Sequence, residues 1–156
     1  MERTLIVLKG DAVQRKLVGR LIGRFEDKGL KLAGLKLLRV GQDLARRMYS
    51  VHEGKDFYAA LVEFITASPV VAIVLEGNGA IAVCRQMMGS TFGPQAQPGT
   101  VRGDFGMSKR YNLIHGSDSP QSAQREIPLF FSPEEIVEYT EAVSAWVYAK
   151  QGGELI

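Results

Sequence analysis

The chain has 156 residues, a formal net charge of +2 and one cysteine, Cys84. This length suits one compact domain over residues 1–156, and Cys84, which sits in an apolar run and cannot form an internal disulfide, is expected to be a small buried side chain. The charge is too small to indicate a nucleic-acid-binding protein, so we expect at most weak, non-specific nucleic-acid binding. The longest apolar run, Val70–Leu75, is too short to cross a membrane. We therefore expect a cytoplasmic protein with no membrane partner.

Hydrophobic periodicity, together with the positions of glycine and proline, divides the first part of the chain into expected elements. In chain order these are a strand over residues 4–9, a helix that Asp11 caps and that runs to Asp27 before Lys28-Gly29, a strand over 31–40, a helix from Asp43 through Tyr49, a helix over 56–67, a strand over 70–75 and a helix over 80–88.

Regular periodicity is lost between Gly89 and Tyr111, where glycine and proline recur. This predicts a long loop, and loops of this length are usually functional. A short strand is expected over 112–115, followed by a helix from Ser119-Pro120 to Phe130. Ser132 followed by Pro133 indicates another helix start, because serine is a common N-cap and proline suits the first helical position. The residues after Lys150 are expected to fray.

The order strand, helix, strand, strand, helix, strand is that of a split β-α-β arrangement, although periodicity alone indicates only a mixed α and β protein. Residues 76–82 also match the G-x-G-x-x-A form of a dinucleotide-binding fingerprint. That fingerprint normally belongs to the first unit of a parallel sheet. Here an irregular segment follows the helix, which argues against dinucleotide binding.

The octet Asn112–Ser119 surrounds His115 with small, acidic and hydroxylic residues. The unperturbed pKa of histidine is about 6.5, so the neutral, nucleophilic imidazole predominates above pH 7. His115 is therefore a candidate phosphate-accepting nucleophile. Gly116 would leave room for a phosphoryl group, Ser117 could orient a carboxylate, and Asp118 could reach a magnesium ion through water. The alternative is a core histidine in a turn, which so many small polar neighbours disfavour.

The pattern N-x-x-H-G-S-D-S of residues 112–119 resembles the active-site signature of the nucleoside diphosphate kinase family. A second stretch, residues 98–105 (P-G-T-V-R-G-D-F), is similar to the family's P-G-T-[IV]-R-G-D-[FY] segment. The resemblance runs from about Arg3 to about Lys150. It implies an α+β sandwich with a ferredoxin-like βαββαβ core, in which helices cover a four-stranded antiparallel sheet.

The resemblance also implies an enzyme, a nucleoside-diphosphate kinase (phosphotransferase). Such an enzyme transfers the γ-phosphate of a nucleoside triphosphate to a nucleoside diphosphate by a ping-pong mechanism, through a phosphohistidine on His115, with Mg2+ and with broad base specificity. Glu126 and Ser117 would support the catalytic imidazole, and Asp118 would act on Mg2+ through water. The remaining matched positions imply contacts to the phosphates, sugar or base by Lys9, Tyr49, Phe57, Arg85, Thr91, Arg102, Lys109 and Asn112.

Several of these residues have specific expected roles. Arg85 and Arg102 match the family's phosphate-binding arginines, whose planar forks neutralise charge on phosphate oxygens. Asn112, together with Lys9, would hold the sugar. Phe57 resembles the residue on which the base stacks, and stacking does not select one base. A core position on the helix over 56–67 is the alternative for Phe57. His52, in a polar segment, is expected to be solvated.

The chain departs from the family pattern at three places. Lys9-Gly10 stands where Lys-Pro is usual, which would hold Lys9 less firmly. In Thr91-Phe92-Gly93-Pro94 the proline is displaced by one position, which puts the stability of the oligomer in doubt. Lys109 replaces an apolar residue that often covers the base, and its alkyl stem could cover the base instead.

Two alternatives concern assembly and activity. The segment through Trp146-Val147-Tyr148 resembles the longer members that form hexamers, so we expect a homo-oligomer, with a hexamer favoured over a tetramer. The second function that the sequence allows is a catalytically weakened nucleotide-binding or regulatory protein of the same fold. Intact His115, Arg102 and Glu126 argue against it.

Overall fold

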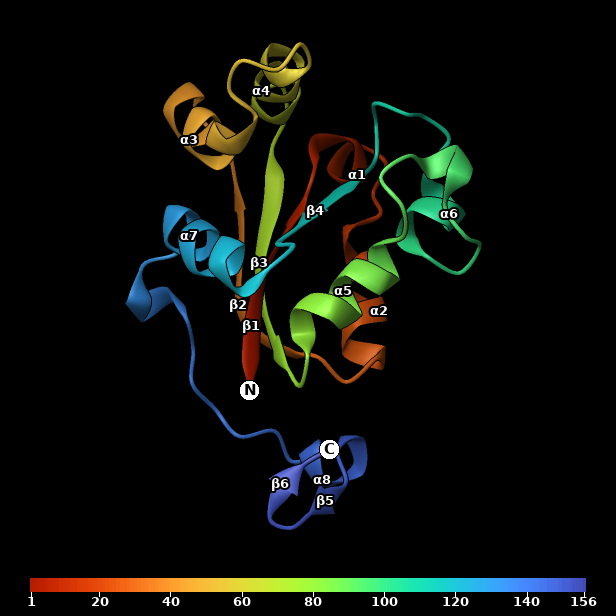
Figure 1. The fold of residues 1–156 in the computed structure, drawn as a ribbon, viewed down its shortest axis with the longest axis vertical. Helices are drawn as coiled ribbons and strands as arrows, with labels where there is room; N and C mark the ends of the chain where they lie inside the picture. Colours follow the sequence, from red (N-terminus) through yellow and green to blue (C-terminus); the bar gives the residue numbers. More distant parts are fainter.

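The computed structural model describes residues 1–156, the side chain of Leu155 excepted. Its centre is a four-stranded sheet of order β2-β3-β1-β4, in which each neighbouring pair is antiparallel (Figure 1). The strands are β1 (Glu2–Leu8), β2 (Lys31–Leu38), β3 (Val70–Gly77) and β4 (Ile114–Gly116). The expected ferredoxin-like arrangement is therefore confirmed, and the antiparallel pairing excludes the parallel unit that the dinucleotide fingerprint requires.

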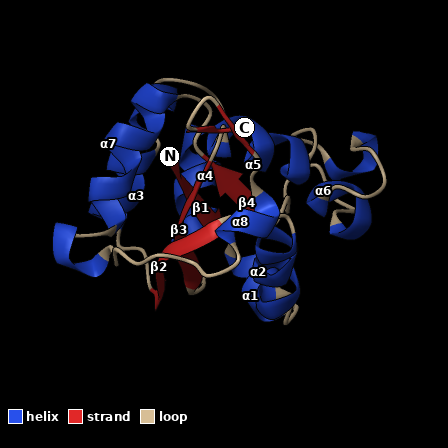
Figure 2. Cartoon of the chain, turned by 90° about the horizontal axis from the view of Figure 1, so that it is seen from below, coloured by secondary structure: helices blue, strands red, loops and turns tan.

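Helices cover both faces of this sheet (Figure 2). One face carries α1 (Gly10–Gln14), α2 (Val18–Asp27), α5 (Ala80–Met88) and α6 (Val101–Phe105), and the other carries α3 (Gln42–Met48), α4 (Tyr58–Thr66) and α7 (Pro120–Phe130). Because both faces are covered, β3 is buried along its whole length and reads as an apolar run rather than an alternating pattern. Cys84 is buried in the core, as expected.

Most expected elements agree with the structure to within about two residues at each end, as is usual for element boundaries. The expected helix over 11–27 is wrong in one respect, because it is interrupted. Lys16 adopts a left-handed conformation with φ of 57°, which ends α1 and redirects the chain before α2. The redirected helix buries Leu21 and Phe25 against the sheet. Asp11 is not an N-cap either, since it lies in the first turn of α1 and Lys9 occupies the N-cap position.

The segment between Gly89 and Tyr111 is not irregular throughout, as the sequence suggested. It contains the 3-10 turn η2 (Gly93–Gln95) and the short helix α6. Thr100 caps α6, because its Oγ1 accepts a hydrogen bond of 3.0 Å from the N–H of Gly103. A five-residue helix that contains a glycine is too short to leave a periodic pattern, so periodicity could not reveal it.

The chain after α7 also differs from expectation. The predicted helix at Ser132 is only the 3-10 turn η3 (Pro133–Glu135), with reciprocal capping between Ser132 and Glu135. The chain then runs past the N-terminal end of β1 to α8 (Ser144–Val147) (Figure 1). Instead of fraying, the final residues form a hairpin of β5 (Lys150–Gln151) and β6 (Glu154–Leu155).

Within the described residues, no helix combines the length and the apolar character that a membrane crossing requires.

Candidate active site

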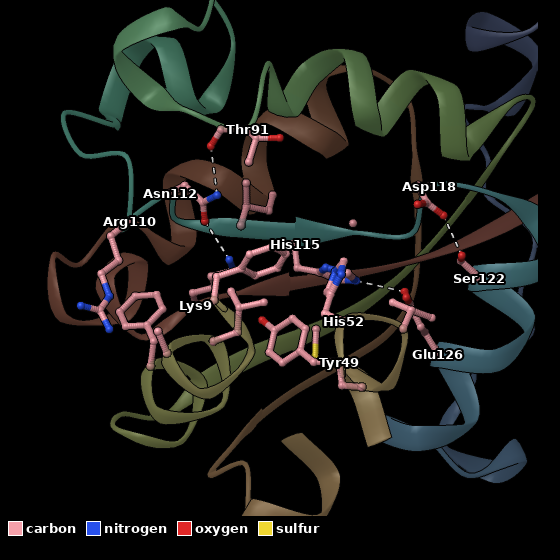
Figure 3. A pocket seen from close by; sticks show the side chains of 18 of the residues that line it. Lys9, Tyr49, His52, Thr91, Arg110, Asn112, His115, Asp118, Ser122 and Glu126 are labelled. Carbon is pink, nitrogen blue, oxygen red and sulfur yellow. Dashed lines mark hydrogen bonds and ion pairs between the residues drawn. The ribbon is translucent and has the colours of Figure 1, made fainter. Parts of the chain in front are cut away.

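The site residues predicted from the sequence, apart from Ser117, line one pocket of about 750 Å³ (Figure 3). A volume of this size is typical of small-molecule sites. The lining includes Lys9, Tyr49, Phe57, Arg85, Thr91, Arg102, Lys109, Asn112, His115, Asp118 and Glu126. These side chains come from the end of β1, from β4, and from the helices and loops on both faces of the sheet. The fold thus gathers residues that are up to about a hundred positions apart.

His115 lies on β4, opposite Val7 of β1. Its Nε2 is 3.0 Å from Oε2 of Glu126, a residue of α7, and Ser117 Oγ donates to the same oxygen at 2.8 Å. Ser117 itself is buried behind the pocket wall. Nδ1 of His115 has no hydrogen-bond partner in the part of the chain that the structure describes. With Nε2–H donating to the carboxylate, the neutral ring keeps its lone pair on Nδ1.

Glu126 is 4 % exposed but stays ionised. Burial acts to raise its pKa, but hydrogen bonds and charges from His115, Ser117 and Arg125 outweigh this effect, so the pKa lies below its ordinary value. Arg125 contributes through a contact of 3.2 Å with Oε1, the oxygen that His115 leaves free. A charged carboxylate with both oxygens engaged can fix the orientation of the imidazole.

Lys9, Asn112 and Thr91 form a chain of hydrogen bonds across the pocket. Lys9 Nζ donates to Oδ1 of Asn112 at 2.7 Å, and Nδ2 of Asn112 donates to the carbonyl of Thr91 at 3.0 Å. Burial, and then the charge of Arg102, lower the pKa of Lys9 to about 8, although Asp11 opposes them. Lys9 is therefore a buried cation that a bound anion would stabilise.

Arg102 has a structural role that the sequence did not reveal. Its guanidinium donates to three backbone carbonyls, those of Gly89 at 3.0 Å, Asn112 at 3.0 Å and Ile114 at 2.6 Å. Burial and the charge of Arg85 lower its pKa to about 10, so it remains charged near neutrality. A guanidinium has five N–H donors, so two remain for an anion in the pocket.

Leu113 has the left-handed φ of 69°, a conformation that usually costs a non-glycine residue about 1–3 kcal/mol. Two contacts hold it there. Its N–H donates to Oδ2 of Asp11 at 3.0 Å, and its carbonyl accepts from the N–H of Lys9 at 2.8 Å. Asp11, expected to cap a helix, instead fixes the backbone between Asn112 and His115.

Two glycines near the pocket allow close packing. A Cβ on Gly10 would lie 2.6 Å from Cβ of Ser68, so glycine in place of proline makes room for that serine. Lys9 is nevertheless held firmly, being 6 % exposed and bonded to Asn112. A Cβ on Gly116 would lie 2.5 Å from Sδ of Met88, so the missing side chain lets β4 pack closely on the core, while Gly116 also lines the pocket.

Phe57 is 49 % exposed and lies just before α4, at the pocket wall and not in the core. His52, expected to be solvated, is half-buried in the same wall, with its ring centroid 5.4 Å from that of Phe57 in an edge-on contact. Burial and the charge of Lys55 lower the pKa of His52. The sequence indicates this position of His52 only through its spacing: His52 follows Tyr49 by three residues, and residues three apart lie on the same face of a helix.

Tyr49 and Asp118 present oxygens to the pocket. The Tyr49 hydroxyl is buried, has no hydrogen-bond partner among the described residues, and has a raised pKa because of burial and the charge of Glu126. Asp118 Oδ1 accepts from Oγ of Ser122 at 2.6 Å and from Oγ of Ser119 at 3.2 Å. The bond from Ser122 contributes most to lowering the pKa of Asp118, and partial burial opposes it, so this surface carboxylate is ionised.

Other lining residues were missed by sequence reasoning. They include Leu61 and Phe64 on α4, Arg110 on the loop before β4, and Ser122 and Arg125 on α7. Each lies on a helix or loop that the sequence predicted. Which side chains of that helix or loop face the pocket depends on how α4, α7 and the loop approach β4.

Comparisons with known proteins agree with the fold and the pocket described above. The family model described as nucleoside diphosphate kinase matches residues 2–136. A nucleoside diphosphate kinase of Pelotomaculum thermopropionicum is 53% identical over 148 residues, which cover 95% of this chain and 99% of the relative. One from Archaeoglobus fulgidus is 50% identical over 151 residues, covering 97% of this chain and 100% of the relative.

Among solved structures, a halophilic nucleoside diphosphate kinase from Halobacterium salinarum in complex with CDP is similar, with a TM-score of 0.93 and 47% sequence identity. The match covers 95% of this chain and 99% of that one.

Proposed function

The chain belongs to the nucleoside diphosphate kinase family, and on this premise we propose that His115 carries the phosphoryl group between nucleotides. The reaction transfers the γ-phosphate of a nucleoside triphosphate to a nucleoside diphosphate in two steps, through a phosphohistidine. One observation supports the assignment to His115 above all others. Glu126 engages Nε2 of the imidazole, which leaves Nδ1 with a lone pair at the pocket.

In the first step Nδ1 attacks the γ-phosphorus. The N–P bond forms while the bond from phosphorus to the β,γ-bridging oxygen breaks, and the nucleoside diphosphate leaves. In the second step a terminal oxygen of another diphosphate attacks the same phosphorus, and the N–P bond breaks. Glu126 keeps the proton on Nε2 and stabilises the positive charge that the ring gains, while Ser117 holds Glu126 in place.

The other side chains bind and orient the substrate. Arg85, Arg102 and Lys9 bring positive charge to the phosphates, where it counters the negative charge spread over the transferring oxygens. Asn112, held between Lys9 and Thr91, is placed to bond the sugar.

The divalent metal ion is proposed to be Mg2+. Among the described residues no group of three or more histidine, cysteine, aspartate or glutamate side chains could hold a metal ion. Of the two carboxylates in the pocket lining, Glu126 is engaged by His115, and Asp118 fits Mg2+, which is usually bound by substrate phosphates, waters and one or two carboxylates. When bound, the ion neutralises phosphate charge.

The experiment that tests the assignment locates the phosphate on the ring. Protein phosphorylated by Mg2+ and ATP is examined by phosphorus–proton correlation NMR, which distinguishes phosphate on Nδ1 from phosphate on Nε2. We expect the Nδ1 product, because Glu126 occupies Nε2. Phosphate on Nε2 would show that the hydrogen bond to Glu126 does not persist during the reaction.

Nucleotide affinity should fall as the pH rises through about 8. The pKa of Lys9 is about 8 in the free protein, so above that pH the lysine loses the charge that attracts phosphate, and binding must restore the proton. The dissociation constant of ADP, measured by titration calorimetry between pH 7 and 9.5, should rise by up to about tenfold per pH unit above pH 8. Lys9→Met should bind weakly with a flatter profile. An equally steep profile in Lys9→Met would assign the effect to another group.

We further propose that residues 1–156 act as one domain of a homo-oligomer, with a hexamer favoured over a tetramer. Exposed apolar side chains support an assembly: Trp146 is 92% exposed in α8, and Leu37 is 67% exposed on the edge strand β2. Light scattering at low and high concentration distinguishes the two states.

The proposed location is the cytoplasm, where the nucleotide substrates occur. A lone buried cysteine such as Cys84 is compatible with the reducing environment there.

A further inference from the structure

One end of the pocket is rich in hydrogen-bond donors. Lys109 and Arg110, on the loop between α6 and β4, line it together with Phe57 and Phe64, and the loop packs against α4 through Tyr111 and Phe64. Figure 3 shows Arg110 on the opposite side of the pocket from the phosphate-accepting His115. A nucleotide with its γ-phosphate at His115 would therefore have room for its base near Arg110.

The backbone of Arg110 is fixed, whereas its guanidinium is free to bind. Its N–H donates to Oγ of Ser108 at 3.0 Å, and the next residue, Tyr111, packs on Phe64 with ring centroids 5.0 Å apart. Among the described residues the guanidinium has one ion pair, with Glu63 at 3.9 Å, and the two side chains are 60% and 82% exposed. Exposed pairs of this kind contribute little, so a ligand can displace Glu63.

We propose that Arg110 gives this enzyme a preference for guanine nucleotides over adenine nucleotides. This inference rests on the proposed function, because it needs the base to lie at this end of the pocket. A guanidinium carries only donors, arranged in a planar fork. Guanine presents two neighbouring acceptors, O6 and N7, which match the fork. Adenine has an amino group at the first of these positions, so donor would face donor.

The other side chains of the pocket do not distinguish guanine from adenine. Stacking on Phe57 acts on any base, because every base has an aromatic face. The carboxylates in the lining, Asp118 and Glu126, lie by His115 at the other end, where Figure 3 labels them. The base edge therefore meets the donors of Arg110, with Lys109 beside it.

The test follows the discharge of isolated phosphoenzyme in a single turnover. Protein labelled from γ-labelled ATP is freed of nucleotide and mixed with subsaturating ADP, GDP or inosine diphosphate. Inosine diphosphate keeps O6 and N7 but lacks the 2-amino group of guanine. We expect GDP and inosine diphosphate to discharge the label at least about fivefold faster than ADP, the lower limit for a good bidentate contact to a base.

Variants assign the effect to the fork of Arg110. Arg110→Ala should bring the ratio of GDP to ADP rates close to one, and so should Arg110→Lys, which keeps the charge but not the planar fork. The matched control is Arg47→Ala, because Arg47 is an exposed arginine on α3 outside the pocket. This control should leave both rates and their ratio unchanged.

Three results would overturn the proposal: a ratio near one in the unmodified enzyme, a preference that Arg110→Ala retains, or inosine diphosphate behaving like ADP. In each case phosphoenzyme that ADP discharges would leave the proposed function standing. If no phosphoenzyme forms at all, the proposed function fails, and the guanine preference fails with it.

Discussion

Replacing His115 by alanine is expected to abolish labelling of the protein by γ-labelled ATP and to reduce steady-state transfer by roughly four orders of magnitude or more. The other pocket groups can bind and neutralise phosphate, but none is an imidazole whose Nε2 bonds a carboxylate, as in His115 with Glu126, while its Nδ1 stays unbonded. Incorporation of acid-labile label, measured on protein freed of nucleotide, checks this expectation.

The control uses the only other histidine of the chain, His52, which lies in the same pocket wall. His52→Ala should still take up label, because His115 and its contact with Glu126 are retained. Label on His115→Ala would show that another residue is the nucleophile. Loss of label from His52→Ala in the same experiment would point to His52.

Replacing Arg102 by methionine is expected to reduce kcat/KM by about a hundredfold to a thousandfold and also to destabilise the fold. The variant removes a cation from the phosphates and takes one donor from each of three carbonyls, those of Gly89, Asn112 and Ile114, of which Asn112 keeps the N–H of Ile114. An unsatisfied buried polar group costs about 1–3 kcal/mol, so the free energy of unfolding should fall by several kcal/mol. Urea unfolding, together with steady-state kinetics at a temperature where the variant is folded, separates the two effects.

Arg102→Lys sharpens this test. Lysine keeps the charge but presents a single nitrogen, which cannot reach three carbonyls in the geometry of a planar fork. We expect most of the loss in stability and in activity to persist. A fully active and stable lysine variant would mean that charge alone accounts for the role of Arg102.

The fold was largely predictable because periodicity and family resemblance agree. The buried run at Val70–Leu75, the serine cap before α7 and the apolar face of α5 are local signals, and the structure has the corresponding elements. The expected elements that were wrong depend on tertiary contacts or are too short to leave a pattern. The interruption at Lys16 is set by how α2 reaches the sheet, and the five residues of α6 are too few for a periodic pattern.

The candidate site could be predicted as a set of residues but not as an arrangement. The octet around His115 indicated the nucleophile, yet which ring nitrogen meets Glu126 depends on the approach of α7 to β4. The bonds of Arg102 reach carbonyls 10 to 13 residues away, and the bond of Asp11 to the strained Leu113 spans 102 residues. No local pattern encodes them.

The most direct test of the central claim, that His115 carries phosphate from one nucleotide to another, is the discharge of isolated phosphoenzyme by a second nucleotide. The protein is labelled with γ-labelled ATP, separated from all nucleotide and mixed with CDP. Labelled CTP should appear in a single turnover as the protein loses its label. If the label stays on the protein, or leaves only as inorganic phosphate, the chain does not pass phosphate between nucleotides through this histidine.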